Sequence, residues 1–220
     1  MPLSRIGTVC AVLSMASACG GVPTTPSSPS SGTALTLSCS KPTLLAGDIV
    51  VCIARAASVN VSTAAVWASS DASIATSEGI GIFVGKSEGQ ATLTATYDGN
   101  SASAKLTVNL EDVLRATASS DQGPFRVGAT ASMWLQGFYG VASAESGRLT
   151  LVIADQDGAT LSTSEPLTVP RGGDRYLLKA TFALPPGTTR VCRTGVLQIG
   201  STTLTVVPDA SLAPCIAVMP

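Results

Sequence analysis

The chain offers few side chains for covalent chemistry, and its clearest motif match is a serine flanked by glycines. Gly85-Lys86-Ser87-Glu88-Gly89 fits the Gly-x-Ser-x-Gly pattern of a hydrolase nucleophile. Such a serine needs a strand-to-helix turn and a histidine to take its proton. The chain contains no histidine, so we expect no catalytic role for Ser87. The overlapping Gly-Lys-Ser is no phosphate loop, because Ile80 stands where the first glycine is needed.

Paired carboxylates are the other candidates for catalysis, because two of them can hydrolyse glycosides without histidine. Asp155 and Asp157 are two residues apart, which puts both on one face of a strand. Asp-x-Asp-Gly can also begin a calcium loop, but Ala159 and Leu161 occupy later ligand positions. The simpler expectation is a turn whose Asp side chains accept backbone N–H groups. We therefore predict no enzyme, cofactor or metal site, and keep a carboxylate hydrolase as an alternative.

The six cysteines carry more information than the acidic residues. Cys10 and Cys19 lie near the N-terminus, and the other four fall in two pairs: Cys39 and Cys52, then Cys192 and Cys215. Four cysteines allow three disulfide connectivities. Pairing within each half of the chain, Cys39–Cys52 and Cys192–Cys215, is the simplest. A zinc site is the alternative, but the chain lacks the Cys-x-x-Cys spacing typical of structural zinc.

The N-terminus has the features of a secretory leader. Arg5 is followed by an uncharged stretch of apolar and small residues, 6–18, which is short for a membrane-spanning helix. It ends in Ala16-Ser17-Ala18, directly before Cys19. This arrangement resembles the lipobox of bacterial lipoproteins, which implies a signal peptide at 1–18 and a diacylglycerol-anchored Cys19. Gly20 resembles the outer-membrane sorting pattern of Gram-negative lipoproteins. Ordinary secretion with an incidental cysteine remains the alternative.

Composition narrows the classes of partner. Residues 19–33 are rich in Pro, Ser and Thr and predict a flexible, extended tether. Charged residues make up 12% of the chain and the net charge is −1, so no electrostatic footprint for nucleic acid is present. We expect a membrane partner through the lipid anchor, and an extracellular protein or glycan as ligand. The expected location is the cell envelope, outside the cytoplasm.

Small and β-branched residues dominate and predict strands throughout. Between residues 34 and 110 the clearest element is a hairpin. Ala91, Leu93, Ala95 and Tyr97 alternate with threonines, the pattern turns at Asp98-Gly99-Asn100, and alternation resumes over 102–108. Further strands are expected at 35–38, 48–55 and 65–69, the last one around Trp67.

Residues 35–110 resemble the bacterial Ig-like domain, group 2. The resemblance implies a β-sandwich common in surface and adhesion proteins, often used as a spacer, with Trp67 in its core and Gly85–Gly89 in a turn. It brings no catalytic residues, and the Cys39–Cys52 pair departs from many members. The matching segments are 35–38, 44–48, 66–71, 73–76, 89–95 and 105–108.

Residues 111–220 predict a second antiparallel sandwich, Ig-like or fibronectin-like. Expected strands lie at 129–139, 149–153, 160–169, 176–184, 189–197 and 202–207. Trp134, Phe138 and Tyr139 are the aromatics that a glycan platform would use. On a regular strand Trp134 and Phe138 lie on one face, and Met133 and Leu135 lie on the other. One of these two faces should pack in the core. These aromatics are expected either in the core or in a ligand-binding surface patch.

The prediction from sequence is therefore an all-β protein with two tandem Ig-like sandwiches behind a signal peptide and a tether. We expect a non-enzymatic, lipid-anchored surface protein with a binding or spacer role. The alternative is an adhesin or carbohydrate-binding protein with its site in residues 111–220.

Overall fold

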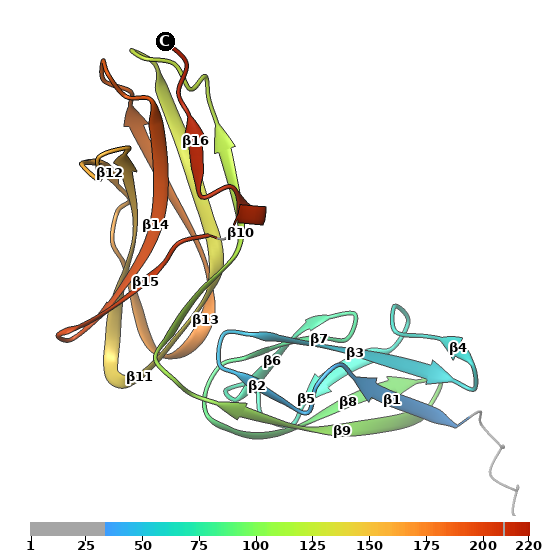
Figure 1. Cartoon of the computed structure of the whole chain (residues 1–220). Coiled ribbons are helices and arrows are strands. Elements are labelled where there is room, and N and C mark those ends of the chain that lie inside the picture. Colours follow the sequence, from blue (N-terminus) through green and yellow to red (C-terminus); the bar gives the residue numbers. More distant parts are fainter. Residues whose placement is uncertain (1–33, 209) are drawn as a thin grey trace, which may run out of the picture. The chain divides into compact units, whose positions relative to one another are not determined.

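The computed structural model describes residues 34–208 and 210–220 (Figure 1). The predicted signal peptide, the lipidated Cys19 and the tether lie outside these residues. The described chain is almost entirely β-structure, with one short 3₁₀ helix, η1 (Ala210–Leu212). The all-β sandwich fold is thus confirmed. The division into domains at residues 110 and 111 stays a prediction, and the two segments are described in turn.

Residues 34–110 form two sheets around an apolar core. One sheet has the order β1-β3-β7-β6, with β4 added to β3, and the other has the order β2-β9-β8-β5. Pairing is antiparallel except between β2 and β9, which run parallel. The strands are β1 (Leu35–Cys39), β2 (Thr43–Leu45), β3 (Ile49–Ala56), β4 (Val59–Asn60), β5 (Val66–Ser69), β6 (Ala75–Gly79), β7 (Ile82–Gly85), β8 (Gly89–Tyr97) and β9 (Asn100–Asn109).

The predicted hairpin is present. Strands β8 and β9 pair from Gly89–Val108 to Tyr97–Asn100, which leaves Asp98 and Gly99 as a two-residue loop. Both loop residues have positive φ, 48° and 74°. That geometry matches the right-handed twist of the strands and is the reason an Asp-Gly pair suits this position.

Trp67 differs from the expectation of a buried core residue. Its side chain is half-buried and packs against two separate apolar clusters. The indole N–H donates to the Ser62 carbonyl at 2.9 Å, and the ring meets Phe83 edge-on at 6.0 Å. β5 ends the order of its sheet, which explains why this residue keeps some solvent contact.

Residues 111–220 form one seven-stranded sheet that folds around a single apolar core. Its order is β10-β11-β14-β15, with β12 and β13 also on β11 and β16 on β14. The strands are β10 (Val113–Gln122), β11 (Thr130–Asp155), β12 (Thr160–Thr163), β13 (Leu167–Ala183), β14 (Arg190–Ile199), β15 (Thr202–Val206) and β16 (Cys215–Ala217).

Strands β11 and β13 are longer than the sequence pattern predicts, since β13 continues between the strands expected at 160–169 and 176–184. β11 joins the strands expected at 129–139 and 149–153, and it pairs with β10, β13 and β14 in turn (Figure 1). Its register with β13 shifts between Val141 and Ser146. The intervening segment has weak apolar alternation and two glycines, Gly140 and Gly147, which suggest a break. Backbone pairing to β13 carries the strand on past this shift.

A glycine permits the close approach of β10 to β11. A Cβ atom at Gly137 would lie 1.8 Å from the carbonyl oxygen of Arg115. The β10–β11 register also shifts here, between Ala116 and Ala118, which leaves Thr117 as a bulge. The same Arg115 carbonyl accepts the Tyr176 hydroxyl at 2.9 Å.

Asp112 holds the irregular part of β11. Its Oδ1 accepts the backbone N–H groups of Ala142 at 2.6 Å and Ser143 at 3.0 Å. Burial alone would raise the pKa of this carboxyl, but hydrogen bonds from Ser143 and Ala142, and the charge of Arg171, outweigh it. The pKa of Asp112 therefore lies below its ordinary value.

Because this pKa is lowered in the folded state, ionised Asp112 stabilises the protein most fully above the ordinary aspartate pKa of about 3.9. That contribution is lost as the pH falls through the lowered folded value. We expect Asp112→Asn to reduce stability at neutral pH, and the difference from wild type to shrink below about pH 4. Urea unfolding at a series of pH values measures this. A difference that stays constant with pH would contradict the prediction.

The predicted disulfide pairs are confirmed. Cys39 and Cys52 are cross-strand neighbours on β1 and β3, with Cα atoms 3.9 Å apart. Cys192 and Cys215 occupy the equivalent relation on β14 and β16, at 4.0 Å. The second bond holds the short β16 to the sheet.

Closing loops of 13 and 23 residues stabilises the fold by about 3 kcal/mol each on the chain-entropy account. We expect the double variant Cys192→Ser with Cys215→Ser to lose roughly that free energy of unfolding in urea. Cys39→Ser with Cys52→Ser should lose slightly less, because its loop is shorter. Wild-type stability that does not change on adding reductant would contradict both expectations.

Candidate functional site

The three predicted ligand-binding aromatics have different environments. Tyr139 is 5% exposed and belongs to the core. Phe138 is on the opposite side of β11 but is only 8% exposed, and the Arg115 guanidinium lies 5.9 Å from its ring centre. Trp134 is half-buried. Of the three, only Trp134 therefore has a ring that a ligand can reach.

Strand register gives Trp134 its neighbours. On β11 the core side chains are Met133 and Leu135, so Trp134 and Gln136 point outward. Ser120 pairs with Trp134 from β10, and Lys179 pairs with it from β13. We call this outward surface the Trp134 face, and it consists of Ala118, Ser120, Ser132, Trp134, Gln136, Leu177, Lys179 and Thr181.

The Trp134 face is shallow and of mixed polarity. Lys179 Nζ lies 4.8 Å from the centre of the indole ring, a cation–π contact. Leu177, two residues before Lys179 on β13 and paired with Gln136, is 64% exposed. A hollow of about 170 Å³ lies beside the indole, lined by Ala118, Ser119, Ser120, Trp134, Gln136 and Leu177.

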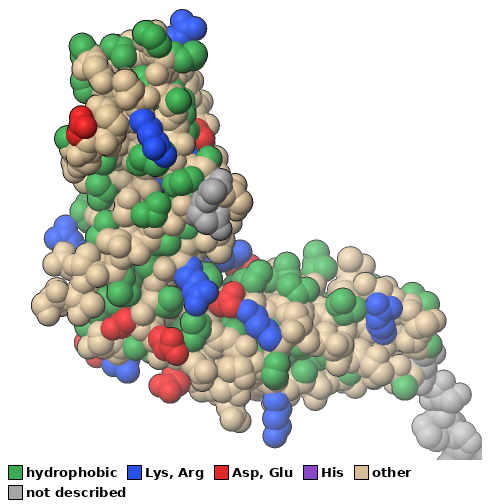
Figure 2. All heavy atoms as spheres, in the orientation of Figure 1, with side chains coloured by type: hydrophobic (Ala, Val, Ile, Leu, Met, Phe, Trp, Pro, Cys, Tyr) green, Lys and Arg blue, Asp and Glu red, His purple; other side chains and the backbone are tan. Residues whose placement is uncertain are grey.

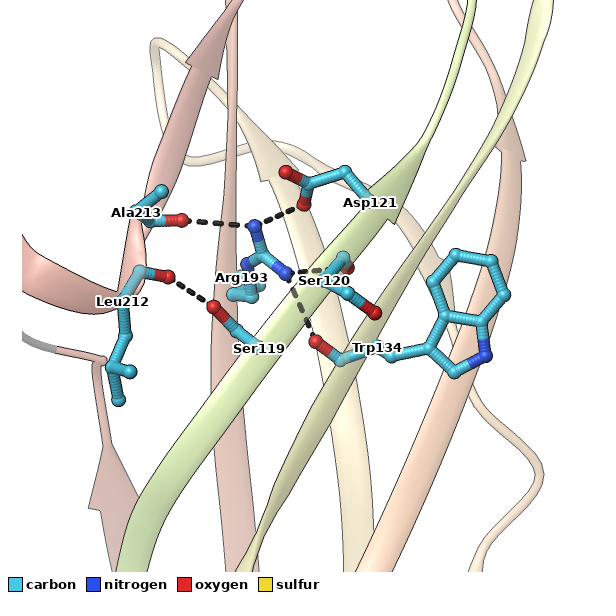
Figure 3. Close-up of polar contacts among 7 residues, drawn as sticks. All are labelled: Ser119, Ser120, Asp121, Trp134, Arg193, Leu212 and Ala213. Atoms are coloured by element: carbon cyan, nitrogen blue, oxygen red, sulfur yellow. Dashed lines mark hydrogen bonds and ion pairs between the residues drawn. The ribbon is translucent and has the colours of Figure 1, made fainter.

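Beneath this face lies a buried arginine. Alternation along β14 directs Val191, Arg193 and Leu197 inward, and Arg193 is 0% exposed. Its Nη1 donates to the carbonyls of Ser120 at 2.8 Å and Trp134 at 2.9 Å. Figure 3 shows the guanidinium under these two strands, with the Trp134 indole pointing away from it.

The other guanidinium nitrogen reaches two more partners. Arg193 Nη2 donates to the Asp121 carboxylate and to the Ala213 carbonyl, the latter at 2.9 Å. Within the described residues, its Nε is the one buried side-chain nitrogen or oxygen without a hydrogen-bond partner. A buried charge is tolerated only when paired and hydrogen-bonded, and these four bonds meet that requirement.

The C-terminal segment closes over this arginine. The Ser119 hydroxyl donates to the Leu212 carbonyl, at the end of η1 (Figure 3). The Arg193 backbone N–H donates to the Pro214 carbonyl at 2.9 Å, and Cys215 is bonded to Cys192. The polar end of the core is thereby covered by residues that sequence patterns did not predict to lie there.

Sequence reasoning missed both Arg193 and Asp121. The sequence could have indicated that Arg193 is buried. On the predicted strand at 189–197 it lies on the same face as the apolar residues Val191 and Leu197. A charge at such a position requires a buried partner. Nothing in the sequence identified that partner, which comes from a strand about 70 residues away.

The remaining predicted motifs have structural roles. Asp155 ends β11, and its Oδ1 accepts the N–H groups of Asp157 at 3.0 Å and Ala159 at 2.8 Å, as expected for a turn. Strand β7 ends at Gly85 and strand β8 begins at Gly89. Ser87 therefore lies in a short connection between two strands, and no helix follows it. The described residues contain no grouping of His, Cys, Asp or Glu suited to a metal ion.

Charged side chains are sparse on the surface that Figure 2 shows, and they lie among apolar and neutral atoms. None of the described residues belongs to a helix long and apolar enough to cross a membrane. No protein-family model matches the chain, and no curated protein matches it. The assignment of the Trp134 face as the candidate site therefore depends on its geometry alone.

We expect Arg193→Met to lower the free energy of unfolding by about 3 kcal/mol, because it leaves Asp121 and several carbonyls without their donor. Adding Asp121→Leu should restore part of the loss, since the unpaired carboxylate is then gone. Arg190→Met, an exposed arginine on the same strand, is the matched control and should change stability by roughly 0.5 kcal/mol at most. Urea unfolding measures the free energy of unfolding of all three variants. An equal effect of Arg193→Met and Arg190→Met would refute a stabilising role for the buried Arg193 bonds.

Proposed function

We propose that this protein is a non-enzymatic lipoprotein of the cell envelope that presents Ig-like β-sandwich modules at the surface. The observation that carries the proposal is the pair of cross-strand disulfides, Cys39–Cys52 and Cys192–Cys215. Disulfides persist in oxidising compartments outside the cytoplasm. The leader that ends at Cys19 supports the same compartment and adds an anchor.

The proposal includes the resemblance of residues 35–110 to the bacterial Ig-like domain, group 2. The strand order and the Asp98-Gly99 hairpin are consistent with such a module. Its role would be that of a spacer between the membrane and residues 111–220. The tether at 19–33 would add reach, because Pro-rich segments remain extended.

The absence of histidine from the whole sequence supports a role without catalysis. Asp155 is engaged by backbone amides in its turn, so the carboxylate-hydrolase alternative gains no support from the geometry. The hollow beside Trp134 has a volume of only about 170 Å³ and is partly open, whereas active sites are usually larger and enclosed. Binding is therefore the activity that the available side chains suit.

The test of the anchor is Cys19→Ser. In wild type we expect the mature protein in the membrane fraction, with an N-terminal Cys19 that carries acyl mass and four other cysteines oxidised. The variant should lose both the acyl mass and the membrane association, because the thioether bond to lipid cannot form. Non-reducing mass analysis and membrane fractionation measure this, with Cys10→Ser as the matched control. An unmodified N-terminus at another residue would rule out the anchor.

A second candidate function is favoured by a specific observation. Trp134 keeps its ring partly exposed beside Lys179, Gln136 and Leu177, although burial of an aromatic ring normally stabilises a small sandwich. A half-exposed tryptophan with polar neighbours is typical of a recognition surface. The protein would then be an adhesin or a carbohydrate-binding protein with its site in residues 111–220.

A further inference from the structure

The Trp134 face has one sign of charge. Its cation is Lys179, and none of its eight residues is acidic. Asp121, the nearest acidic residue on β10, is bound to Arg193. Glu165 lines a hollow together with Leu177 and Lys179, but none of the four ion pairs among the described residues includes Lys179. The face is therefore complementary to a ligand that carries a negative charge.

Uncommitted hydrogen-bonding groups flank the indole. No hydrogen bond between described residues uses the side-chain amide of Gln136 or the hydroxyl of Ser120. Ser132 and Thr181 bond to each other at 2.8 Å across the strands. A ligand on this surface thus meets one aromatic ring, one cation, one amide and several hydroxyls, all within neighbouring strand pairs.

The shape of the face limits the kind of ligand. A hollow of about 170 Å³ on an open sheet surface does not enclose a small molecule, which normally occupies a deeper pocket. A single cation is too few for nucleic acid, which requires many phosphate contacts, or for an anionic membrane, which requires clusters of basic residues. A polymer that lies across the strands and presents one ring at a time fits better.

We infer that the Trp134 face binds an acidic polysaccharide, with a uronate sugar in the hollow beside the indole and its carboxylate on Lys179. Gln136 and Ser120 would hydrogen-bond the sugar hydroxyls. This inference rests on the second candidate function proposed above, and it specifies the class of ligand.

The buried arginine supports this site from inside. Because Arg193 bonds the carbonyls of both Ser120 and Trp134, it holds the two strands whose side chains form the face. Groups held in place before binding lose less conformational entropy when the ligand arrives. Arg193 is therefore a positioning residue for the Trp134 face and does not touch the ligand.

The first experiment titrates the mature protein with sodium polygalacturonate and, separately, with neutral dextran. The chain contains two tryptophans, so a Trp67→Phe variant makes Trp134 the only indole and its fluorescence the reporter. We expect a saturable change in emission with polygalacturonate, none with dextran, and weaker binding as salt is added. Equal changes with both polymers, or none with polygalacturonate, would overturn the inference.

The second experiment uses affinity electrophoresis in gels that contain polygalacturonate. Trp134→Ala should bind roughly tenfold or more weakly, as is usual for a central interface tryptophan. Lys179→Gln should bind about threefold to tenfold more weakly and lose most of its salt dependence. Lys105→Gln, an exposed lysine on β9, is the matched control and should bind like wild type.

These results distinguish a failure of the polysaccharide-binding inference from a failure of the predicted envelope anchor. Unchanged retardation of both Trp134→Ala and Lys179→Gln would overturn the assignment of the face, whatever the fate of Cys19. Loss of acylation with retained polysaccharide binding would instead overturn the envelope anchor and leave the inference standing. Circular dichroism of each variant confirms that lost binding does not reflect lost folding.

Discussion

The guanidinium of Arg193 is the constraint around which residues 111–220 are arranged. It is fully buried beside a large apolar cluster, so it must find hydrogen-bond acceptors from several directions. Strand β10 supplies a carbonyl and the Asp121 carboxylate, β11 supplies the carbonyl of Trp134, and the C-terminal segment supplies the carbonyl of Ala213. Three parts of the chain that are distant in sequence therefore meet at one side chain. The Cys192–Cys215 bond, at the residue next to the arginine, secures the last of them.

The pair Ser120 and Trp134 connects this core to the surface. Their backbones are bonded to Arg193 on one side of the sheet, and their side chains lie on the other side. A β-strand allows its backbone to bond the core while these side chains face outward, because successive side chains alternate between its two faces. A binding surface built in this way is supported by the stability of the core, and needs no long loop. Trp134 can therefore remain half-exposed while the strand that carries it stays paired on both sides.

Much of the fold could be predicted, and the failures have identifiable reasons. Alternation with period two located the β8–β9 hairpin, and the Asp98-Gly99 pair specified its turn, because both signals are local. The patterns did not predict β10 or β16, which carry many small or polar residues and owe their position to pairing with β11 and β14. The patterns also predicted two separate strands at 129–139 and 149–153, whereas pairing with β13 makes β11 continuous past the shift at Val141. The candidate site was predicted in part: Trp134 was named with Phe138 and Tyr139, but parity alone left open which face was core.

The sequence by itself determined the all-β class and the turns, and it made Cys39–Cys52 with Cys192–Cys215 the simplest of three connectivities. These depend on residue type, short spacing and the side-chain alternation of a strand, all of which act over a few residues. Only the tertiary structure decided which aromatic is exposed, that Lys179 lies against Trp134, and that Arg193 has Asp121 as its partner. These are contacts between strands whose register is set by the packing of the whole core. A shift of one residue in the register would turn every side chain of a strand to the other face. The register therefore decides these contacts, and no local sequence pattern specifies it.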